Sequence, residues 1–247
     1  MGTLTARQRL GEGRHAPPLP RRALRALGGI LVVAGVLTLA WTLVVWRWQD
    51  PFTAIYTHFQ QQRLARSYAR RASTFVRAEG DLRAQAARYR RSLRVGDAVG
   101  RLQIGRIGLN MIVVQGTDHT SLQKGPGHYV GSALPGQGRL VYVAGHRTTY
   151  LAPFADIDRI RVGDVIVFSL PYGTFRYRVS RHYVVPADDV GALRNTGREI
   201  LRLQACHPRF FATERYLVDA RLVSAAPRPA QPPRKNVRVR SSTGSTG

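Results

Sequence analysis

The chain holds a single cysteine, Cys206, at the end of the strand-like segment EILRLQAC (199–206). With a period of two, the apolar side chains of this segment fall on one face and Cys206 falls on the other. The apolar face, which we expect to lie in the core, consists of Leu201, Leu203 and Ala205. The segment therefore predicts a thiol outside the core, where it can serve as a nucleophile.

Two further side chains are candidates for the same chemistry. Arg215 begins the segment RYLVDARLV (215–223), after the loop 207–214. If the two segments pair as a hairpin, Arg215 meets Cys206 at its mouth, where a guanidinium favours thiolate and can donate to a developing oxyanion. His146 follows the segment RLVYVAG (139–145), and a histidine just past a strand end is well placed to border a cleft. This set predicts acyl transfer by Cys206 with proton transfer by His146.

Competing sites have weaker support. The other histidines are His15, His58, His119, His128, His182 and His207. His207 adjoins Cys206, but neighbouring strand residues point to opposite faces, so it is poorly placed to exchange a proton with the thiol. One cysteine supplies one thiolate, and no His/Cys pair has zinc-ligand spacing, so we expect no metal and no cofactor. We interpret Asp156, Asp158 and Asp164 as solvated acids rather than a calcium site.

The elements that must position these residues are short strands. From residue 95 onward, segments that alternate apolar and polar residues are separated by turn signals such as KGPG (124–127) and LPG (134–136). Besides the three above, the expected strands are 101–109, 111–115, 164–170 and 174–185. This pattern indicates an all-β barrel or sandwich. Residues 95–224, about 130 in number, suffice for an apolar core without disulfides.

A membrane anchor precedes this domain. Residues 28–46, GGILVVAGVLTLAWTLVVW, carry no charge and would span roughly 28 Å as a helix, close to the hydrocarbon thickness. A cleaved signal peptide is the alternative, but the apolar run is long for one and no Ala-x-Ala-like site follows. The arginines of residues 1–27 favour a cytoplasmic N-terminus and place the later domain outside the cell.

The charge of the chain is strongly positive, with 38 Lys+Arg against 14 Asp+Glu and a formal net charge of +24. Much of the excess lies in the flanks. Residues 47–94 are rich in Ala, Arg, Gln and Leu and predict a helical stalk, or alternatively a basic helix lying on anionic lipid. Residues 225–247 offer little to bury and predict a disordered tail. Nucleic acid is disfavoured as a partner because the domain is expected outside the cell.

The blocks AGHRTTYLAPF and LQACHPRFFATERYLV resemble the sortase family, in particular its class E-like housekeeping branch. IGRIGLNMIVVQGTD, KGPGHY and ALPGQGRLVYVAGH also resemble its blocks, in the same order, so that the resemblance covers residues 95–224. It implies an all-β sortase-type closed barrel of about eight strands with short helices. The family's nucleophile, histidine and arginine fall on Cys206, His146 and Arg215. The family usually reads Thr-Leu-x-Thr-Cys, whereas Ala205 precedes the cysteine here.

The resemblance implies a membrane-anchored cysteine transpeptidase. Its substrates would be secreted proteins with a C-terminal sorting signal similar to LPxTG or LAxTG, cleaved between Thr and Gly. The acyl group would pass to an amine of a peptidoglycan precursor or another protein. An L,D-transpeptidase is a rival, but its Ser-x-Gly-Cys context is absent. A membrane-tethered, non-enzymatic binder of anionic wall polymers is a second rival, and its binding would survive replacement of Cys206.

Overall fold

The computed structural model describes residues 21–48, 51–75 and 81–228. Its contacts divide the chain into two compact units, Met1–Arg47 and Trp48–Gly247, which are described separately. The first unit contains nearly all of α1 (Arg21–Trp48), which includes the predicted anchor 28–46. Its portion Arg21–Val44 has a mean hydropathy of 2.2 and is long and apolar enough to cross a membrane.

The two threonine hydroxyls inside this apolar helix are satisfied within the helix. The hydroxyl of Thr38 donates to the carbonyl of Ala34, and that of Thr42 donates to the carbonyl of Thr38, each at 2.8 Å. A hydroxyl that bonds four residues back adds no unpaired donor to a hydrocarbon environment. The sequence of α1 is therefore compatible with a membrane span despite its two threonines.

The second unit is built on a closed eight-stranded barrel with the strand order β1-β2-β3-β4-β7-β8-β6-β5. Two pairs, β2–β3 and β4–β7, are parallel, and the other pairs are antiparallel. The strands are β1 (Ala98–Ile104), β2 (Leu109–Gln115), β3 (Gly127–His128), β4 (Leu140–Ala144), β5 (Val165–Leu170), β6 (Gly173–Pro186), β7 (Ile200–His207) and β8 (Glu214–Pro227). The predicted all-β barrel is confirmed.

The two-residue strand β3 was not predicted, and strand boundaries differ most from the predicted ones at two places. The segment 101–109 is not one strand: β1 ends at Ile104, the 3-10 turn η1 (Gly105–Ile107) follows, and β2 begins at Leu109. Gly108 makes this reversal with a φ of 63°, a region that favours glycine. At the other end, β8 continues to Pro227 against β6, so residues 225–227 of the predicted tail are in the sheet. The tail beyond residue 228, like residues 1–20, lies outside the described residues.

The barrel interior follows the predicted alternation. Leu201, Leu203 and Ala205 of β7 are buried, with Ala205 at 1% exposure. Val218 and Ala220 of β8 join them in the main apolar cluster. Inward and outward side chains alternate along strands, so these residues fill the barrel and leave the intervening positions of β7 on its outer surface.

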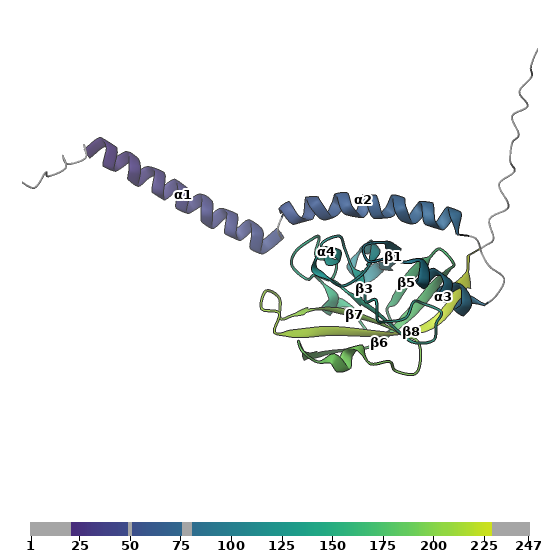
Figure 1. The fold of residues 1–247 in the computed structure, drawn as a ribbon. Coiled ribbons are helices and arrows are strands. Elements are labelled where there is room, and N and C mark those ends of the chain that lie inside the picture. Colours follow the sequence, from purple (N-terminus) through teal and green to yellow (C-terminus); the bar gives the residue numbers. More distant parts are fainter. Residues whose placement is uncertain (1–20, 49–50, 76–80, 229–247) are drawn as a thin grey trace, which may run out of the picture. The chain divides into compact units, whose positions relative to one another are not determined.

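Helices α2 (Pro51–Thr74) and α3 (Leu82–Ser92) confirm the helical prediction for the segment before the barrel. α2 lies along the barrel rather than clear of it (Figure 1). Gln61 holds it there by donating to the carbonyl of Ile112 at 2.9 Å and accepting from the Ile112 N–H at 2.7 Å. Tyr68, two turns further on, donates to the carbonyl of Ser169 at 3.0 Å. The first helix of the predicted stalk thus forms part of the barrel unit.

Besides η1, three short helical segments lie in the described connections between strands. They are α4 (His119–Leu122), η2 (Ile157–Arg159) and η3 (Val190–Leu193). α4 follows β2, η2 follows β4, and η3 lies between β6 and β7. The segments α4 and η3 contribute to the surroundings of the candidate site.

Candidate active site

Three neighbouring strands bring the predicted residues to one edge of the barrel. β4 and β7 are parallel, so their carboxyl ends lie at the same edge, and the antiparallel β8 begins there. Cys206 of β7 lies directly opposite Arg215 of β8, as the predicted hairpin requires. The N–H of Gly145 donates to the carbonyl of Gln204 at 3.0 Å, which extends the β4–β7 ladder to the residue before His146.

Cys206 is half-buried and carries a free thiol. It lies outside the apolar cluster that contains its neighbour Ala205. Arg215 is also half-buried, and its Nη1 donates to the carbonyls of Ala212 and Glu214, both at 2.8 Å. These bonds tie the guanidinium to the loop before β8 and to the first residue of β8, and they keep it at the mouth of the hairpin.

His146 is half-buried in the connection after β4. Its Nε2 is buried and has no hydrogen-bond partner among the described residues. Burial lowers the pKa of His146, and the charge of His119 lowers it further. The ring centroid lies 5.1 Å from that of Tyr150, so an aromatic ring covers part of the imidazole. A neutral imidazole with a free nitrogen is equipped to accept a proton.

Arg147 connects the His146 segment to the end of β7, and the sequence reasoning missed it. Its side chain is 4% exposed and forms an ion pair with Asp158 at 2.7 Å. Its Nη1 lies 2.9 Å from Nδ1 of His207 and donates to the carbonyl of Cys206 at 3.4 Å. The only signal in the sequence was its place directly after His146. Because Arg147 contacts both segments, it restrains the position of one relative to the other.

The three aspartates that we interpreted as solvated acids all have cationic partners. The interpretation is wrong for Asp164, whose side chain is only 15% exposed, whereas the side chain of Asp158 is 49% exposed. Asp158 pairs with the buried Arg147, and Asp164 forms a bidentate pair with Arg106. Asp156 lies 3.7 Å from Arg159, and both side chains of this pair are well exposed. The described residues contain no group of three or more His, Cys, Asp or Glu side chains that could hold a metal ion.

The competing histidines have other partners. His128 is fully buried, with Nδ1 2.8 Å from Oε1 of Gln115 and Nε2 2.9 Å from the carbonyl of Ala133. Burial lowers the pKa of His128 to about 4. His207, next to Cys206, pairs with Arg147 as described. His15 lies outside the described residues.

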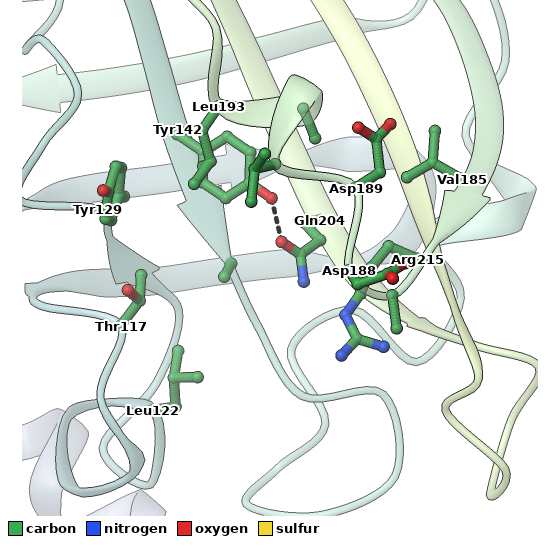
Figure 2. Close-up of a pocket in the computed structure, with 14 residues that line it drawn as sticks. Thr117, Leu122, Tyr129, Tyr142, Val185, Asp188, Asp189, Leu193, Gln204 and Arg215 are labelled. Carbon is green, nitrogen blue, oxygen red and sulfur yellow. Dashed lines mark hydrogen bonds between the residues drawn. The ribbon is translucent and has the colours of Figure 1, made fainter.

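A pocket of about 300 Å³ opens beside the hairpin, at the lower end of the roughly 300–1,000 Å³ of small-ligand sites. Its lining residues include Gln204, which shares a strand face with Cys206, and Arg215, which lies opposite the thiol (Figure 2). The hydroxyl of Tyr142 donates to Oε1 of Gln204. Cys206 and His146 themselves do not line the pocket. The pocket therefore extends to Gln204 and Arg215, the neighbours of the thiol, but not to the thiol itself.

The connection between β6 and β7 forms one wall of this pocket, with Asp188, Asp189 and residues of η3. A buried arginine holds this wall: Arg202 donates to the carbonyl of Ala192 in η3 and is paired with Asp219 of β8. Strand alternation places Arg202 on the outer face of β7, together with Gln204 and Cys206. It is on that face, but only 3% exposed, because η3 and Asp219 enclose it.

Comparison with known proteins agrees with this architecture. Residues 102–223 match the Sortase domain family. Sortase D of Bacillus subtilis (strain 168) is 31% identical over 133 residues, which cover 52% of this chain and 66% of the Bacillus protein. The sortase E structure from Streptomyces avermitilis is 32% identical, with a TM-score of 0.50, over 57% of this chain and 97% of that one.

The fold is also that of more distant structures. The Clostridium perfringens sortase D5 transpeptidase has a TM-score of 0.58 at 21% identity, over 67% of this chain and 99% of that one. The matches thus carry both the D and the E designations. From the matched domain, the barrel and the relative at 32% identity, we conclude that the chain belongs to the sortase family, whose members are cysteine transpeptidases.

Proposed function

We propose that the chain cleaves the Thr–Gly bond of an LPxTG- or LAxTG-type sorting signal and transfers the acyl group to a cell-wall amine. Cys206 is the nucleophile, His146 the general acid and base, and Arg215 the group that stabilises the oxyanion. The convergence of β4, β7 and β8 at one barrel edge is the observation that supports this assignment, because the strand before His146 ends at the same edge as Cys206, which lies 60 positions later in the sequence.

The proposed first half-reaction makes a thioester. The sulfur of Cys206 attacks the threonine carbonyl carbon while the thiol proton passes to His146. The carbonyl oxygen gains the negative charge of the tetrahedral intermediate, and Arg215 donates hydrogen bonds to it. When the C–N bond breaks, His146 protonates the departing glycine nitrogen. The products are an acyl-enzyme at Cys206 and a free amine.

The second half-reaction reverses these roles. An incoming amine attacks the thioester carbonyl and loses a proton to His146, and the C–S bond breaks. The released thiolate regains a proton from His146, so that a new amide forms and no proton is gained or lost overall. A site that keeps a neutral imidazole, as the lowered pKa of His146 favours, suits the steps in which His146 accepts a proton.

The pocket beside the hairpin is the proposed groove for the sorting signal. The apolar side chains that line it come from α4, β4 and η3: Leu122, Tyr142, Val190 and Leu193. The polar Gln204 lines it as well. Such a surface suits the leucine and the small second residue of an LPxTG- or LAxTG-like peptide. Because Ala205 has no hydroxyl and lies in the core, it leaves oxyanion stabilisation to Arg215 and the backbone.

The proposed setting is the outer face of a cell membrane. α1 has the length and composition of a single span, and the arginines before its apolar core favour a cytoplasmic N-terminus. The barrel would then meet secreted proteins bearing a sorting signal and the amine of a peptidoglycan precursor. The class E-like assignment is part of the proposal, since relatives of both designations match.

The test uses the full chain in detergent micelles, fluorogenic LPxTG and LAxTG peptides, and a glycine-type amine. Cys206→Ala, His146→Ala and Arg215→Ala should each lose most of the turnover and keep the wild-type melting temperature. Arg209→Ala is the matched control, because Arg209 is an exposed arginine in the loop that connects β7 to β8. Full activity of the Cys206→Ala protein would rule the mechanism out. An inert wild-type protein that binds anionic polymers independently of Cys206 would favour the non-enzymatic binder.

A further inference from the structure

The segment after His146 has an unusual backbone. Tyr150, Leu151 and Ala152 have φ values of 53°, 59° and 36°, and none of them is glycine. The left-handed region costs a non-glycine residue roughly 1–2 kcal/mol, because Cβ approaches the following carbonyl. Backbone of this kind persists where surrounding contacts hold it, and it is concentrated at functional sites. The contacts that hold this segment are therefore informative.

Two of these contacts lie within the segment. The N–H of Phe154 donates to the carbonyl of His146 at 3.0 Å, and the N–H of Ala152 donates to the carbonyl of Thr149 at 2.8 Å. They close the segment into a compact turn that starts at the imidazole-bearing residue. The position of Tyr150, at the first left-handed residue, depends on contacts with other elements.

Those contacts come from α2 and α4. The N–H of Tyr150 donates to Oγ1 of Thr53, in the first turn of α2, at 3.0 Å. The Tyr150 hydroxyl accepts from Nε2 of Gln123, just after α4, at 2.9 Å. Thr57, one turn after Thr53, donates to the carbonyl of Gln123 at 2.8 Å. The two threonines near the start of α2 thus act on Tyr150, Thr53 directly and Thr57 through Gln123.

Tyr150 in turn covers His146. The two ring centroids are 5.1 Å apart with an angle of 38° between the planes. The imidazole therefore has a neighbour whose position is set by α2. A shift of Tyr150 would change both the room available to the ring of His146 and the direction of its unpaired Nε2.

We propose that Thr53 is a positioning residue: the first turn of α2 holds the strained segment 150–152 and, through Tyr150, sets the orientation of the His146 imidazole. The inference rests on the proposed role of His146 in proton transfer. It makes α2, which begins three positions after the end of the apolar helix α1, a working part of the active site rather than a spacer. Thr53 itself touches neither substrate nor the reacting atoms.

The experiment compares three variants of the full chain in detergent micelles. Thr53→Val keeps the shape and removes the acceptor, whereas Thr53→Ser keeps the acceptor. Thr74→Val is the matched control, because the Thr74 hydroxyl bonds carbonyls of its own helix. We expect Thr53→Val to lower kcat on the sorting peptide about fivefold to tenfold, the value of one hydrogen bond, with KM within twofold. Thr53→Ser and Thr74→Val should keep the wild-type kcat.

Amide hydrogen exchange gives a readout that does not depend on peptide cleavage. Thr53→Val should speed exchange in the peptide covering residues 147–155 at least tenfold and leave β7 unchanged, whereas Thr74→Val should change neither. Unchanged exchange in 147–155 would overturn the proposal, as would faster exchange with an unchanged kcat. A wild-type chain that cleaves no sorting peptide overturns the proposed function, whereas an active wild-type chain with unchanged exchange in Thr53→Val overturns the positioning proposal alone.

Discussion

The buried ion pair behind the pocket allows a quantitative prediction. Asp219 is 1% exposed and accepts two hydrogen bonds from Arg202, at 2.6 and 2.8 Å, while the side chain of Arg202 is 4% exposed. The same carboxylate also binds Arg181 at 2.9 Å, but the side chain of Arg181 is 61% exposed. One acid therefore has a buried and an exposed partner, which separates the effect of burial from that of the pairing itself.

The two partners should respond very differently to mutation. Asp219→Asn leaves the guanidinium of Arg202 buried without a counter-charge, which costs about 3–5 kcal/mol. Arg181→Met removes a solvent-screened partner and should cost about 0–1 kcal/mol. At about 2–4 °C of melting temperature per kcal/mol for a unit of this size, the first change corresponds to about 6–20 °C and the second to at most about 4 °C.

The assay is thermal unfolding of the full chain in detergent, followed by near-ultraviolet circular dichroism of the tyrosines. Tryptophan fluorescence is unsuitable because Trp41, Trp46 and Trp48, the three tryptophans of the chain, all lie in α1. The double variant Arg202→Met/Asp219→Leu removes both charges and should recover most of the loss, since a buried pair often exchanges for apolar residues without cost. Equal shifts for Asp219→Asn and Arg181→Met would refute the reasoning.

Three further outcomes follow from single sites. The free energy of unfolding should fall by about 3 kcal/mol as the pH drops from 6.5 to 4, because burial lowers the pKa of His128 to about 4 and only the unfolded chain binds the proton in that window. A pH series of melting temperatures measures this fall, and His128→Gln should flatten the dependence of the melting temperature on pH. Ala205→Thr should lower the free energy of unfolding by about 1–3 kcal/mol in the same thermal unfolding assay, because it places a hydroxyl in the barrel core. An unchanged melting temperature would mean that the core offers that hydroxyl a hydrogen-bond partner. Arg147→Met should lower kcat at least tenfold by freeing the His146 segment from β7. Arg147→Lys should recover only part of the lost kcat, because a lysine cannot reproduce the contacts to Asp158 and His207 together. Steady-state kinetics measure both variants, and full activity of Arg147→Met would contradict the prediction.

Local pattern was sufficient for most of the barrel strands and for the placement of the thiol, but not for the short strand β3 or the turn between β1 and β2. A strand places alternate residues on opposite faces whatever surrounds it, so EILRLQAC by itself assigned Leu203 and Ala205 to the core and Cys206 to the outside. The same reasoning paired Cys206 with Arg215, because two strands joined by a short loop have few alternatives to a hairpin.

Tertiary structure decided what covers each outward face. Strand alternation placed Arg202 outside the barrel, but it could not show that η3 and Asp219 would bury it there. The pairing of Arg147 with Asp158 and the contact of Thr53 with Tyr150 likewise join positions that no local period relates. Side-chain direction follows from the backbone of a few neighbouring residues, whereas burial depends on which distant segments fold over that side chain.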